Sequence, residues 1–411
     1  MAVDKVTALR IKREIRNIEE ELIKIRRLIH MNPELSNQEQ ATSKLITSKL
    51  LPFGLDVQSN VAGTGVVALL RGINDGITIA FRAEMDAMPI EERTNLPYQS
   101  LNPGVMHACG HDINMVIAMG TAMVLSSLRE TLKGNVKFVF QPAQEASPFD
   151  GESGARLMIK EGVLENPSVG AIFGLHAWPA DVGTVFLSSG TALAGSDWFR
   201  LTIKGKSAPA SKPQEGKDAL SLAAQVMVSI QSLLGRTIDP AEPYILSFGK
   251  IQGGTRANII PREVQLEGVI QAFNPSTLEK IRRFMDEAVR GLSKSVGAEY
   301  ELVFKEKAPP LYNHPELVEL IRPSIEEVLG ENKINSLNPQ LISDDFSYFS
   351  QKIPGLYLLL GVKDPAWKTM TPLYSSTFSP DERSISLGVQ FMCHLLLDCL
   401  EKQVNSSYQP D

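Results

Sequence analysis

The chain of 411 residues has three cysteines, no excess of basic residues and no long uninterrupted apolar segment. Three cysteines are too few to form a disulfide scaffold in a protein of this size. The 41 basic residues are outnumbered by 47 acidic ones, so the net charge of −6 provides no basic field for nucleic acid. No apolar run reaches the roughly 18 residues of a membrane span, and residues 1–16 lack the apolar core of a signal peptide. We therefore expect a cytoplasmic protein that binds neither nucleic acid nor membranes.

The length of the chain exceeds what a single hydrophobic core usually organises, which predicts two domains. In the first part, short β-branched or aromatic segments alternate with helical ones. The strand candidates are residues 65–70, 77–82, 136–140 and 171–175, and the helix candidates are residues 15–30 and 113–128. This alternation predicts an α/β domain with a mainly parallel sheet and helices on both faces, whose ligand sites lie beyond the carboxyl ends of the strands.

A different pattern begins near residue 195, where residues 197–206 alternate between apolar and polar side chains, as in a half-exposed strand. The predicted elements that follow are a helix at 218–234, strands at 244–251 and 263–273, a helix at 276–296 and a strand at 299–305. The order β-α-β-β-α-β is typical of a ferredoxin-like α+β domain. We therefore expect residues 195–307 to be inserted into an α/β domain of residues 1–194 and 308–411, leaving a cleft for a small ligand.

Metal-binding residue types gather just before the second predicted helix. Cys109 and His111 stand two residues apart in a loop, and thiolate and imidazole are good ligands for zinc or a similar ion. Alone, such a pair is at least as typical of a loop with a packed cysteine and a hydrogen-bonded histidine. However, Glu145 follows one predicted strand and His176 ends another, so both are expected at the same edge of the sheet. The sequence therefore indicates a candidate metal site.

Eight motifs occur in a fixed order along almost the whole chain. They begin at Ile29 (Ile-His-Met-Asn-Pro-Glu-Leu-Ser), Arg82 (Arg-Ala-Glu-Met-Asp-Ala-Met-Pro-Ile), Met106 (Met-His-Ala-Cys-Gly-His-Asp), Phe140 (Phe-Gln-Pro-Ala-Gln-Glu), Gly174 (Gly-Leu-His), Gly253 (Gly-Gly-Thr-Arg-Ala-Asn-Ile-Ile-Pro), Ser343 (Ser-Asp-Asp-Phe) and Tyr374 (Tyr-Ser-Ser-Thr-Phe). The sequence thus resembles the aminoacylase and carboxypeptidase type of metallopeptidase, in the branch of hippurate hydrolases and auxin-conjugate amidohydrolases. The resemblance implies a catalytic α/β domain with an inserted lid domain, through which a homodimer commonly forms.

The resemblance also implies a set of metal ligands. Members of that branch use two metal ions held by a cysteine, three histidines and a glutamate. Four of these positions correspond to Cys109, His111, Glu145 and His176, but the fifth is Tyr374. A neutral phenol is a poor ligand at pH 7, because its reference pKa is near ~10. We therefore expect one divalent ion, zinc or manganese, or a metal-free site, and not the second ion.

Two further departures from the family pattern concern catalysis. The family motif Gln-Pro-Ala-Glu-Glu supplies a general base with its first glutamate, whereas this chain has Gln144, whose amide accepts no proton at useful pH. The lid motif of the family contains a histidine that reaches the oxyanion, whereas this chain has Pro209. Losing one oxyanion donor costs roughly 10² to 10³ in rate, and losing acid-base help about 10² to 10⁴. Ordinary amide hydrolysis is therefore expected to be impaired.

Other positions that the resemblance assigns to the site also differ. Glu84 replaces the first aspartate of Arg-Ala-Asp-Met-Asp, and Asn114 replaces the second histidine of Cys-Gly-His-Asp-Gly-His. Gln271 stands where the family has an arginine for the substrate carboxylate, so the bidentate ion pair is lost. The expected catalytic positions are Glu84, Asp86 and Gln144, and the expected substrate-binding positions are Asn114, Pro209, Asn258, Gln271 and Tyr374.

Three functions remain open from the sequence. The favoured one is a diverted reaction on a small acyl or amino-acid-like substrate, such as acyl transfer, amide formation or cyclisation, for which weak water activation is an advantage. The second is a non-catalytic descendant that binds a ligand or a partner protein. The third is a conventional N-acyl amino acid hydrolase with a substitute base, such as Glu84 or Glu145. A likeness of fold does not decide among them.

Overall fold

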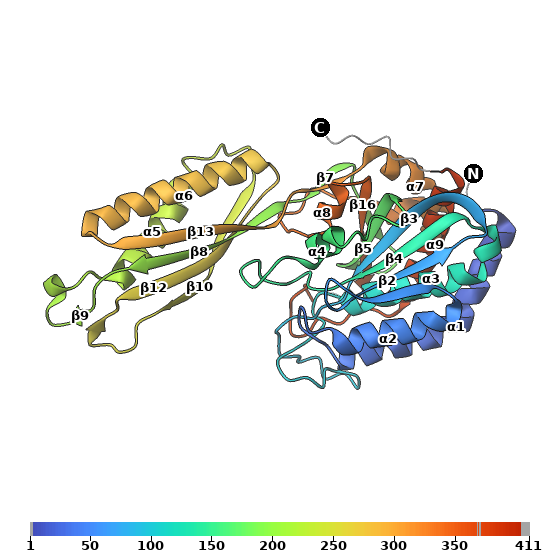
Figure 1. The fold of residues 1–411 in the computed structure, drawn as a ribbon, viewed down its shortest axis with the longest axis horizontal. Coiled ribbons are helices and arrows are strands. Elements are labelled where there is room, and N and C mark those ends of the chain that lie inside the picture. Colours follow the sequence, from blue (N-terminus) through green and yellow to red (C-terminus); the bar gives the residue numbers. More distant parts are fainter. Residues whose placement is uncertain (1–2, 368, 370, 404–411) are drawn as a thin grey trace. The chain divides into compact units, whose positions relative to one another are not determined.

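The computed structural model describes residues 3–367, 369 and 371–403 (Figure 1). The chain divides into two compact units. The first unit comprises Met1–Ala192, Tyr312–Asn338 and Asp345–Asp411, and the second comprises Leu193–Leu311 and Pro339–Asp344. The short strands β7 (Gly190–Leu193) and β14 (Leu311–Asn313) contain two of the four points where the chain passes from one unit to the other.

An eight-stranded sheet forms the centre of the first unit. Its strands, in sheet order, are β1 (Asp56–Val61), β2 (Gly65–Arg71), β4 (Lys133–Gln141), β3 (Asn74–Glu84), β5 (Val169–Asp181), β16 (Gly355–Lys363), β6 (Val185–Leu187) and β15 (Ile334–Ser336). The four central strands β4, β3, β5 and β16 are parallel neighbours. Strands buried on both faces read as nearly continuous apolar runs, which is the case for β16.

Helices cover both faces of this sheet. The helices of the first unit are α1 (Lys5–Met31), α2 (Gln40–Leu50), α3 (His111–Ser127), α4 (Gly154–Lys160), α7 (Pro315–Leu329), α8 (Ser347–Ser350) and α9 (Arg383–Glu401). On one face α3 and α9 pack against β3, with α1 and α7 packed on α9. On the other face of β4, the buried Lys137 donates hydrogen bonds to backbone carbonyls that follow α4, at Val163, Glu165 and Pro167. The expected α/β class is therefore confirmed.

The C-terminal helix α9 is a core helix of the first unit. Among the described residues it is the one helix that is long and apolar enough to cross a membrane, but 78% of its apolar window is buried inside the unit. Cys393 and Cys399 lie on this helix, and both are free and buried. Burial of this kind is expected for a helix that packs against α1, α3 and α7.

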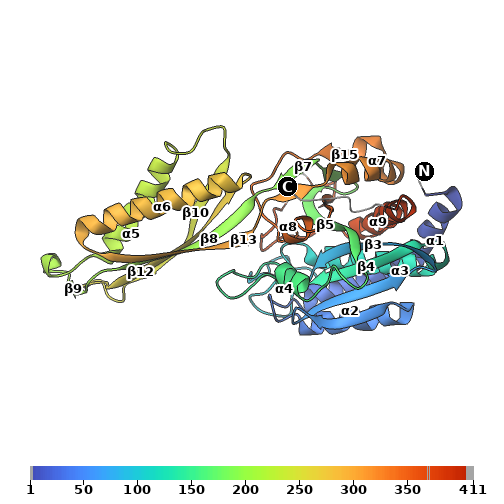
Figure 2. The ribbon, with the colours of Figure 1, turned by 45° about the horizontal axis from the view of Figure 1, so that its top comes forward.

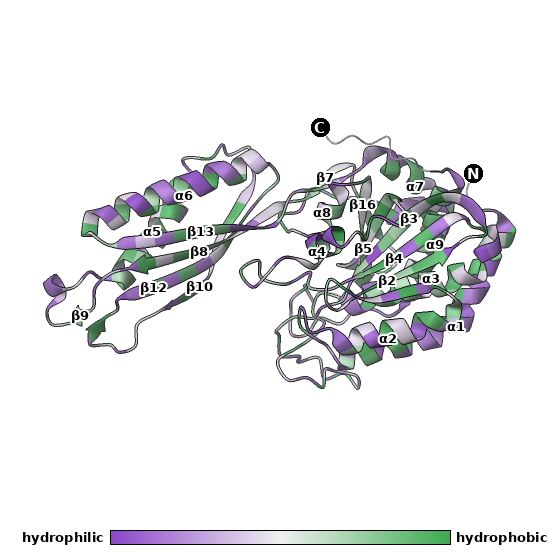
Figure 3. Cartoon of the chain, in the orientation of Figure 1, coloured by the Kyte–Doolittle hydropathy of each residue, from purple (hydrophilic) through white to green (hydrophobic). Residues whose placement is uncertain are grey.

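The second unit has the predicted ferredoxin-like order. Its elements are β8 (Gly195–Lys204), α5 (Ala219–Leu234), β10 (Tyr244–Gly253), β12 (Glu263–Ala272), α6 (Pro275–Val296) and β13 (Glu299–Ala308). The strands form an antiparallel sheet in the order β10-β12-β8-β13, and α5 and α6 share one core with it (Figure 2). Figure 3 shows hydrophilic and hydrophobic residues interleaved along α6, as expected for a helix with one buried side.

Candidate functional site

Three metal-type donors meet at the carboxyl ends of the first unit's parallel strands. Cys109 lies in the loop before α3, His111 begins α3, and His176 lies on β5. Their donor atoms all lie within 4.8 Å of one another, and all three side chains are buried. The Cys109 Sγ and His176 Nε2 atoms are 3.5 Å apart. Because thiolate sulfur and imidazole nitrogen are typical zinc ligands, the cluster has the composition and size of a metal site.

Glycine at position 110 makes this convergence possible. Gly110 has a φ of +84°, and an added Cβ would lie 2.7 Å from the Cβ of Ala177. A side chain at this position would therefore push the loop away from β5. The glycine lets the residues on either side of it, Cys109 and His111, approach His176 together.

Backbone carbonyls orient both imidazoles of the cluster. Nδ1 of His111 is 2.7 Å from the carbonyl oxygen of Asp86, and Nδ1 of His176 is 2.7 Å from the carbonyl oxygen of Ala177. Each Nδ1 therefore donates its proton to a carbonyl, which leaves Nε2 as the ring atom that faces the other donors and would bind a metal ion once its own proton is displaced. Among the described residues, the buried Nε2 of His111 has no hydrogen-bond partner. An unpartnered buried ring nitrogen beside a thiol fits a metal ion.

The surroundings of the cluster favour positive charge. Burial opposes protonation of His176, but the neighbouring Cys109 outweighs it and raises the pKa of His176 to about 9. Burial alone would raise the pKa of Asp86, but contacts with His111, Ser36 and the Glu145 backbone lower it to about 2. Asp86 is therefore ionised, with Oδ1 3.4 Å from Nδ1 of His111. A cation is thus stabilised where the three donors meet.

The loop after β4, which carries Gln144 and Glu145, is held by two buried carboxylates. Ala143 has a φ of +53°, which is uncommon for a residue with a side chain. Its backbone N–H donates to Glu39 over 2.8 Å, and the Glu145 N–H donates to Asp86 over 2.8 Å. Gln144 lies between these two anchors and is 5% exposed. The loop conformation therefore fixes the amide at the position where the family pattern has its base.

Tyr374 closes the site next to Glu145. Its hydroxyl donates to the Glu145 carboxylate over 3.0 Å, and its backbone N–H donates to the carbonyl of Ala108 over 2.9 Å. Removal of the hydroxyl from water, together with the charges of Cys109 and Glu145, raises the pKa of Tyr374 well above its usual value. The residue as a whole is 50% exposed, but its hydroxyl is removed from water. Tyr374 is therefore a neutral donor to Glu145.

A fully buried polar network lies behind the donor cluster. Glu84 accepts hydrogen bonds from Arg82 and, over 3.0 Å, from the side chain of Asn114. Arg82 also donates to Gln141 over 2.8 Å and to Asp345 over 2.9 Å. Glu84 is 0% and Asn114 1% exposed. The hydrogen bonds described for Glu84 and Asn114 are therefore all internal to the protein.

The remaining residues singled out from the sequence belong to the second unit. Pro209 pairs with Ile259 in a two-stranded ladder formed by β9 (Ala208–Pro209) and β11 (Ile259–Ile260). The carbonyl of Asn258 accepts a hydrogen bond of 3.0 Å from the backbone of Ala210, so Pro209 and Asn258 are neighbours. Gln271 lies near the carboxyl end of β12 and is partly buried.

A buried ionic cluster beside the start of α3 was not predicted from the sequence. Arg26 Nε and His30 Nδ1 on α1 each lie 2.8 Å from the same Asp112 oxygen. Both residues are 0% exposed, although charged side chains of a helix usually face solvent. Their position in the sequence could have indicated this burial, because Arg26 and His30 are four residues apart and adjoin the apolar stripe that contains Leu22 and Ile29. This cluster fixes the turn that carries His111.

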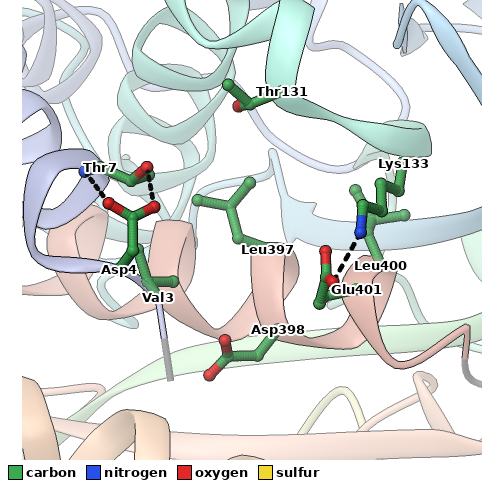
Figure 4. A pocket seen from close by; sticks show the side chains of 9 residues that line it. All are labelled: Val3, Asp4, Thr7, Thr131, Lys133, Leu397, Asp398, Leu400 and Glu401. Carbon is green, nitrogen blue, oxygen red and sulfur yellow. Dashed lines mark hydrogen bonds and ion pairs between the residues drawn. The ribbon is translucent and has the colours of Figure 1, made fainter. Parts of the chain in front are cut away.

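A separate cavity of about 270 Å³ lies between the beginning of α1 and the end of α9 (Figure 4). It is lined by Val3, Asp4, Thr7, Thr131, Lys133, Leu397, Asp398, Leu400 and Glu401. Internal contacts already engage its charged groups, since Asp4 caps α1 through Thr7 and Lys133 pairs with Glu401 (Figure 4). None of its lining residues belongs to the donor cluster, so the cavity is distinct from the candidate site.

Comparison with known proteins gives consistent matches over most of the chain. The model of peptidase family M20/M25/M40 matches residues 80–398. The chain is 35% identical over 391 residues to thermostable carboxypeptidase 1 of Saccharolobus solfataricus, covering 94% of this chain and 97% of that protein. It is 33% identical over 377 residues to the N-acetyl-L-cysteine deacetylase of Bacillus subtilis, covering 91% and 87%.

Solved structures agree with these matches. The Bacillus subtilis YXEP protein, described as a dinuclear metal-binding peptidase of the M20 family, is similar with a TM-score of 0.76 and 31% identity, covering 94% of this chain and 99% of that one. A protein from methicillin-resistant Staphylococcus aureus is similar with a TM-score of 0.83 and 28% identity, covering 95% and 99%. The similarity spans both units of the chain.

Proposed function

Because the chain belongs to the peptidase M20/M25/M40 family, we propose that it binds one divalent metal ion and acts on a small N-acyl amino acid-like substrate, with hydrolysis impaired and acyl transfer favoured. One juxtaposition carries this proposal: a complete cluster of three metal donors lies beside a loop whose base position holds an amide, Gln144. The cluster argues for retained metal chemistry, and the amide argues against efficient activation of water.

The chain's own residues fit one ion. Cys109, His111 and His176 would hold it. The half-buried carboxylate of Glu145 lies outside this group of three and bonds to Tyr374, and it is the candidate for a fourth donor. When bound, zinc or manganese supplies Lewis-acid polarisation of an acyl carbonyl. The YXEP protein is described as dinuclear, but here the Tyr374 hydroxyl is already a donor to Glu145. A neutral phenol that donates a proton to Glu145 offers no ligand for a second ion, which supports one bound ion and not two.

Neither Glu84 nor Asp86 is well placed to replace the missing base. Both oxygens of Glu84 accept hydrogen bonds from Arg82 and Asn114, and the side chain is fully buried. Asp86 is buried as well, and its Oδ2 accepts hydrogen bonds from Ser36 and the Glu145 backbone. A group that is engaged in this way neither reaches a substrate nor accepts its proton readily. The conventional hydrolase with Glu84 as the substitute base is therefore the weaker alternative.

An amine nucleophile depends less on Gln144 than water does. A neutral amine attacks with its free lone pair, whereas water needs a base to take its proton early in the reaction. In the proposed transfer, the bond from the acyl carbon to its leaving group breaks and a bond to the amine nitrogen forms. The proton released by that nitrogen ends on the leaving group. Cyclisation is the same reaction when the amine belongs to the acyl donor.

The second unit is proposed to act as a lid and to join two chains into a homodimer, as the family resemblance implies. Pro209 carries no imidazole for an oxyanion, whereas the amide of Asn258 is exposed and can donate a hydrogen bond. Gln271 offers an amide where an arginine would pair with a carboxylate, so a substrate without a free carboxylate suits this site better.

The test measures metal content and then product partition. Elemental analysis of the purified protein should find one zinc or manganese per chain, and a Cys109→Ala variant should lose it. The protein is then given N-acyl amino acids and acyl thioesters, with and without an amine acceptor, and the products are identified by mass spectrometry. Mostly new amide supports transfer. Mostly free acid would mean conventional hydrolysis, and no product with metal bound would favour the non-catalytic binding protein.

A further inference from the structure

We infer that Asn114 is a positioning residue that aims the imidazole of His176 at the donor cluster. The inference rests on the proposed function, because it assigns His176 to the metal site. It replaces the expectation that Asn114 contacts substrate. Asn114 lies on α3, three residues after His111, so both face the same side of the helix.

Both ends of the Asn114 amide are engaged by the strands of the sheet. Its Nδ2 donates to Glu84 at the end of β3 over 3.0 Å, and its Oδ1 accepts from the backbone N–H of Ala177 on β5 over 3.0 Å. The amide thus links two neighbouring parallel strands to α3 at the level of the donor cluster. Its orientation is defined, because only the NH₂ end suits a carboxylate and only the oxygen suits an N–H.

Glu84 anchors this link. Its second oxygen accepts from Arg82, which also donates to Gln141 on β4 and to Asp345. Charge-assisted hydrogen bonds of this kind are about twice as strong as neutral ones. The carboxylate that holds Asn114 is therefore fixed from behind by a buried guanidinium.

Ala177 transmits the constraint to His176. Its N–H is held by Asn114, and its carbonyl accepts the Nδ1 proton of His176 over 2.7 Å. With Nδ1 so bound, the opposite ring atom, Nε2, lies 3.5 Å from Sγ of Cys109. Asn114 therefore acts on His176 through one residue of backbone, without touching the imidazole's donor atom.

The two linked side chains depart from the family motif together. Glu84 is one methylene longer than the aspartate of that motif, and Asn114 is smaller than its histidine. The longer side chain on β3 reaches the shorter one on α3, and the hydrogen bond between them is 3.0 Å long. We therefore expect the two positions to be energetically coupled.

The test compares Asn114→Ala with Thr121→Ala, a matched control. Thr121 lies on the same helix and is as deeply buried, and within the described part of the chain its hydroxyl bonds to the helix backbone at Ile117 alone. Loss of an outer-shell partner typically weakens metal binding about 10- to 100-fold. Asn114→Ala should therefore bind Co²⁺ about 10- to 100-fold more weakly, with an altered cobalt ligand-field spectrum, whereas Thr121→Ala should keep the affinity and spectrum of the unaltered protein.

A double substitution tests the coupling. Asn114→His alone places a larger ring against Glu84 and should also weaken Co²⁺ binding, whereas Glu84→Asp with Asn114→His should recover most of the loss. Wild-type cobalt affinity and spectrum in Asn114→Ala would overturn the positioning role.

If the unaltered protein binds no Co²⁺ or Zn²⁺, the proposed metal site fails, and the positioning role is decided by nitrogen-15 NMR of the metal-free imidazole, assigned with His176→Gln. The Nδ1–H resonance of His176 should show the downfield shift of its hydrogen bond to the Ala177 carbonyl in the unaltered protein and in Thr121→Ala, and should lose that shift in Asn114→Ala. An unchanged His176 signal would contradict the inference.

Discussion

The hydroxyl of Tyr374 lies 3.0 Å from the Glu145 carboxylate and donates a hydrogen bond to it. The tyrosine adopts a φ of +63°, a backbone conformation that non-glycine residues rarely take and that is often found at functional sites. Because the phenol replaces the imidazole that the family resemblance implies, the number of metal ions should depend on this side chain.

Tyr374→His should raise the metal content from one ion per chain toward two, because an imidazole supplies a lone pair where the phenol supplies a proton. The measurement is elemental analysis after dialysis against excess zinc or manganese. Tyr374→Phe is the matched control, since it removes the hydroxyl without adding a ligand and should leave one ion. A histidine variant with unchanged stoichiometry would refute the assignment of this position.

Gln144→Glu should raise the hydrolysis of N-acyl amino acids by roughly 10² to 10⁴, the usual contribution of a positioned general base. The backbone anchors at Ala143 and Glu145 do not involve the Gln144 side chain, so the loop should keep its conformation. The release of free amino acid is measured with Gln144→Ala as the control.

Adding Pro209→His and Tyr374→His to Gln144→Glu should increase the rate of hydrolysis further. If this triple variant binds two ions but hydrolyses none of a broad panel of N-acyl amino acids, the assignment of these three positions or of the substrate class is wrong.

Removal of the metal should lower thermal stability, because an ion that binds only the folded chain stabilises it by mass action. At a free metal concentration of 100 times Kd, the expected stabilisation is about 2.7 kcal/mol. Calorimetry with and without a chelator should therefore show a lower Tm for the metal-free protein. Cys109→Ala should be much less sensitive to the chelator, and equal sensitivity in both proteins would exclude a role for this thiol in binding.

Periodicity was sufficient to predict most of the elements that position the site. The expected strands at 77–82 and 136–140 lie inside β3 and β4, and the family resemblance is confirmed by the matched relatives. These predictions succeeded because an apolar stripe or alternation is a local property of the chain. The assigned roles of Cys109, His111, Glu145 and His176 are still predictions.

Long-range partners could not be predicted from the same patterns. Asn114 was expected to contact substrate, yet its amide joins Glu84 to Ala177, which follows it by 63 residues. Likewise, periodicity places Arg26 on a helix but does not show that Asp112 lies 2.8 Å away. A buried charge implies a partner without naming it, because the partner is set by packing. The structure was needed to identify each pair.

The buried His30 should make the stability of the fold depend on pH. Its Nδ1 lies 2.8 Å from Asp112, and its Nε2 lies 3.2 Å from Glu92. Burial and the neighbouring Arg26 oppose protonation, but the hydrogen bonds to the two carboxylates outweigh them and raise the pKa of His30 above its ordinary value of 6.5. The folded chain therefore holds this proton more tightly than the unfolded chain does.

A raised pKa in the folded state contributes stability that is complete below the unfolded pKa and is lost as pH rises through the folded pKa. His30→Gln should therefore reduce the free energy of unfolding most at about pH 6, on the order of 3 kcal/mol, and less at about pH 9. The control is His394→Gln, because burial lowers the pKa of His394 to about 4 and keeps it neutral throughout this range. Urea unfolding of the three proteins across this pH range measures both differences. A His30→Gln penalty that is constant with pH, as expected for His394→Gln, would show that His30 is buried without its proton.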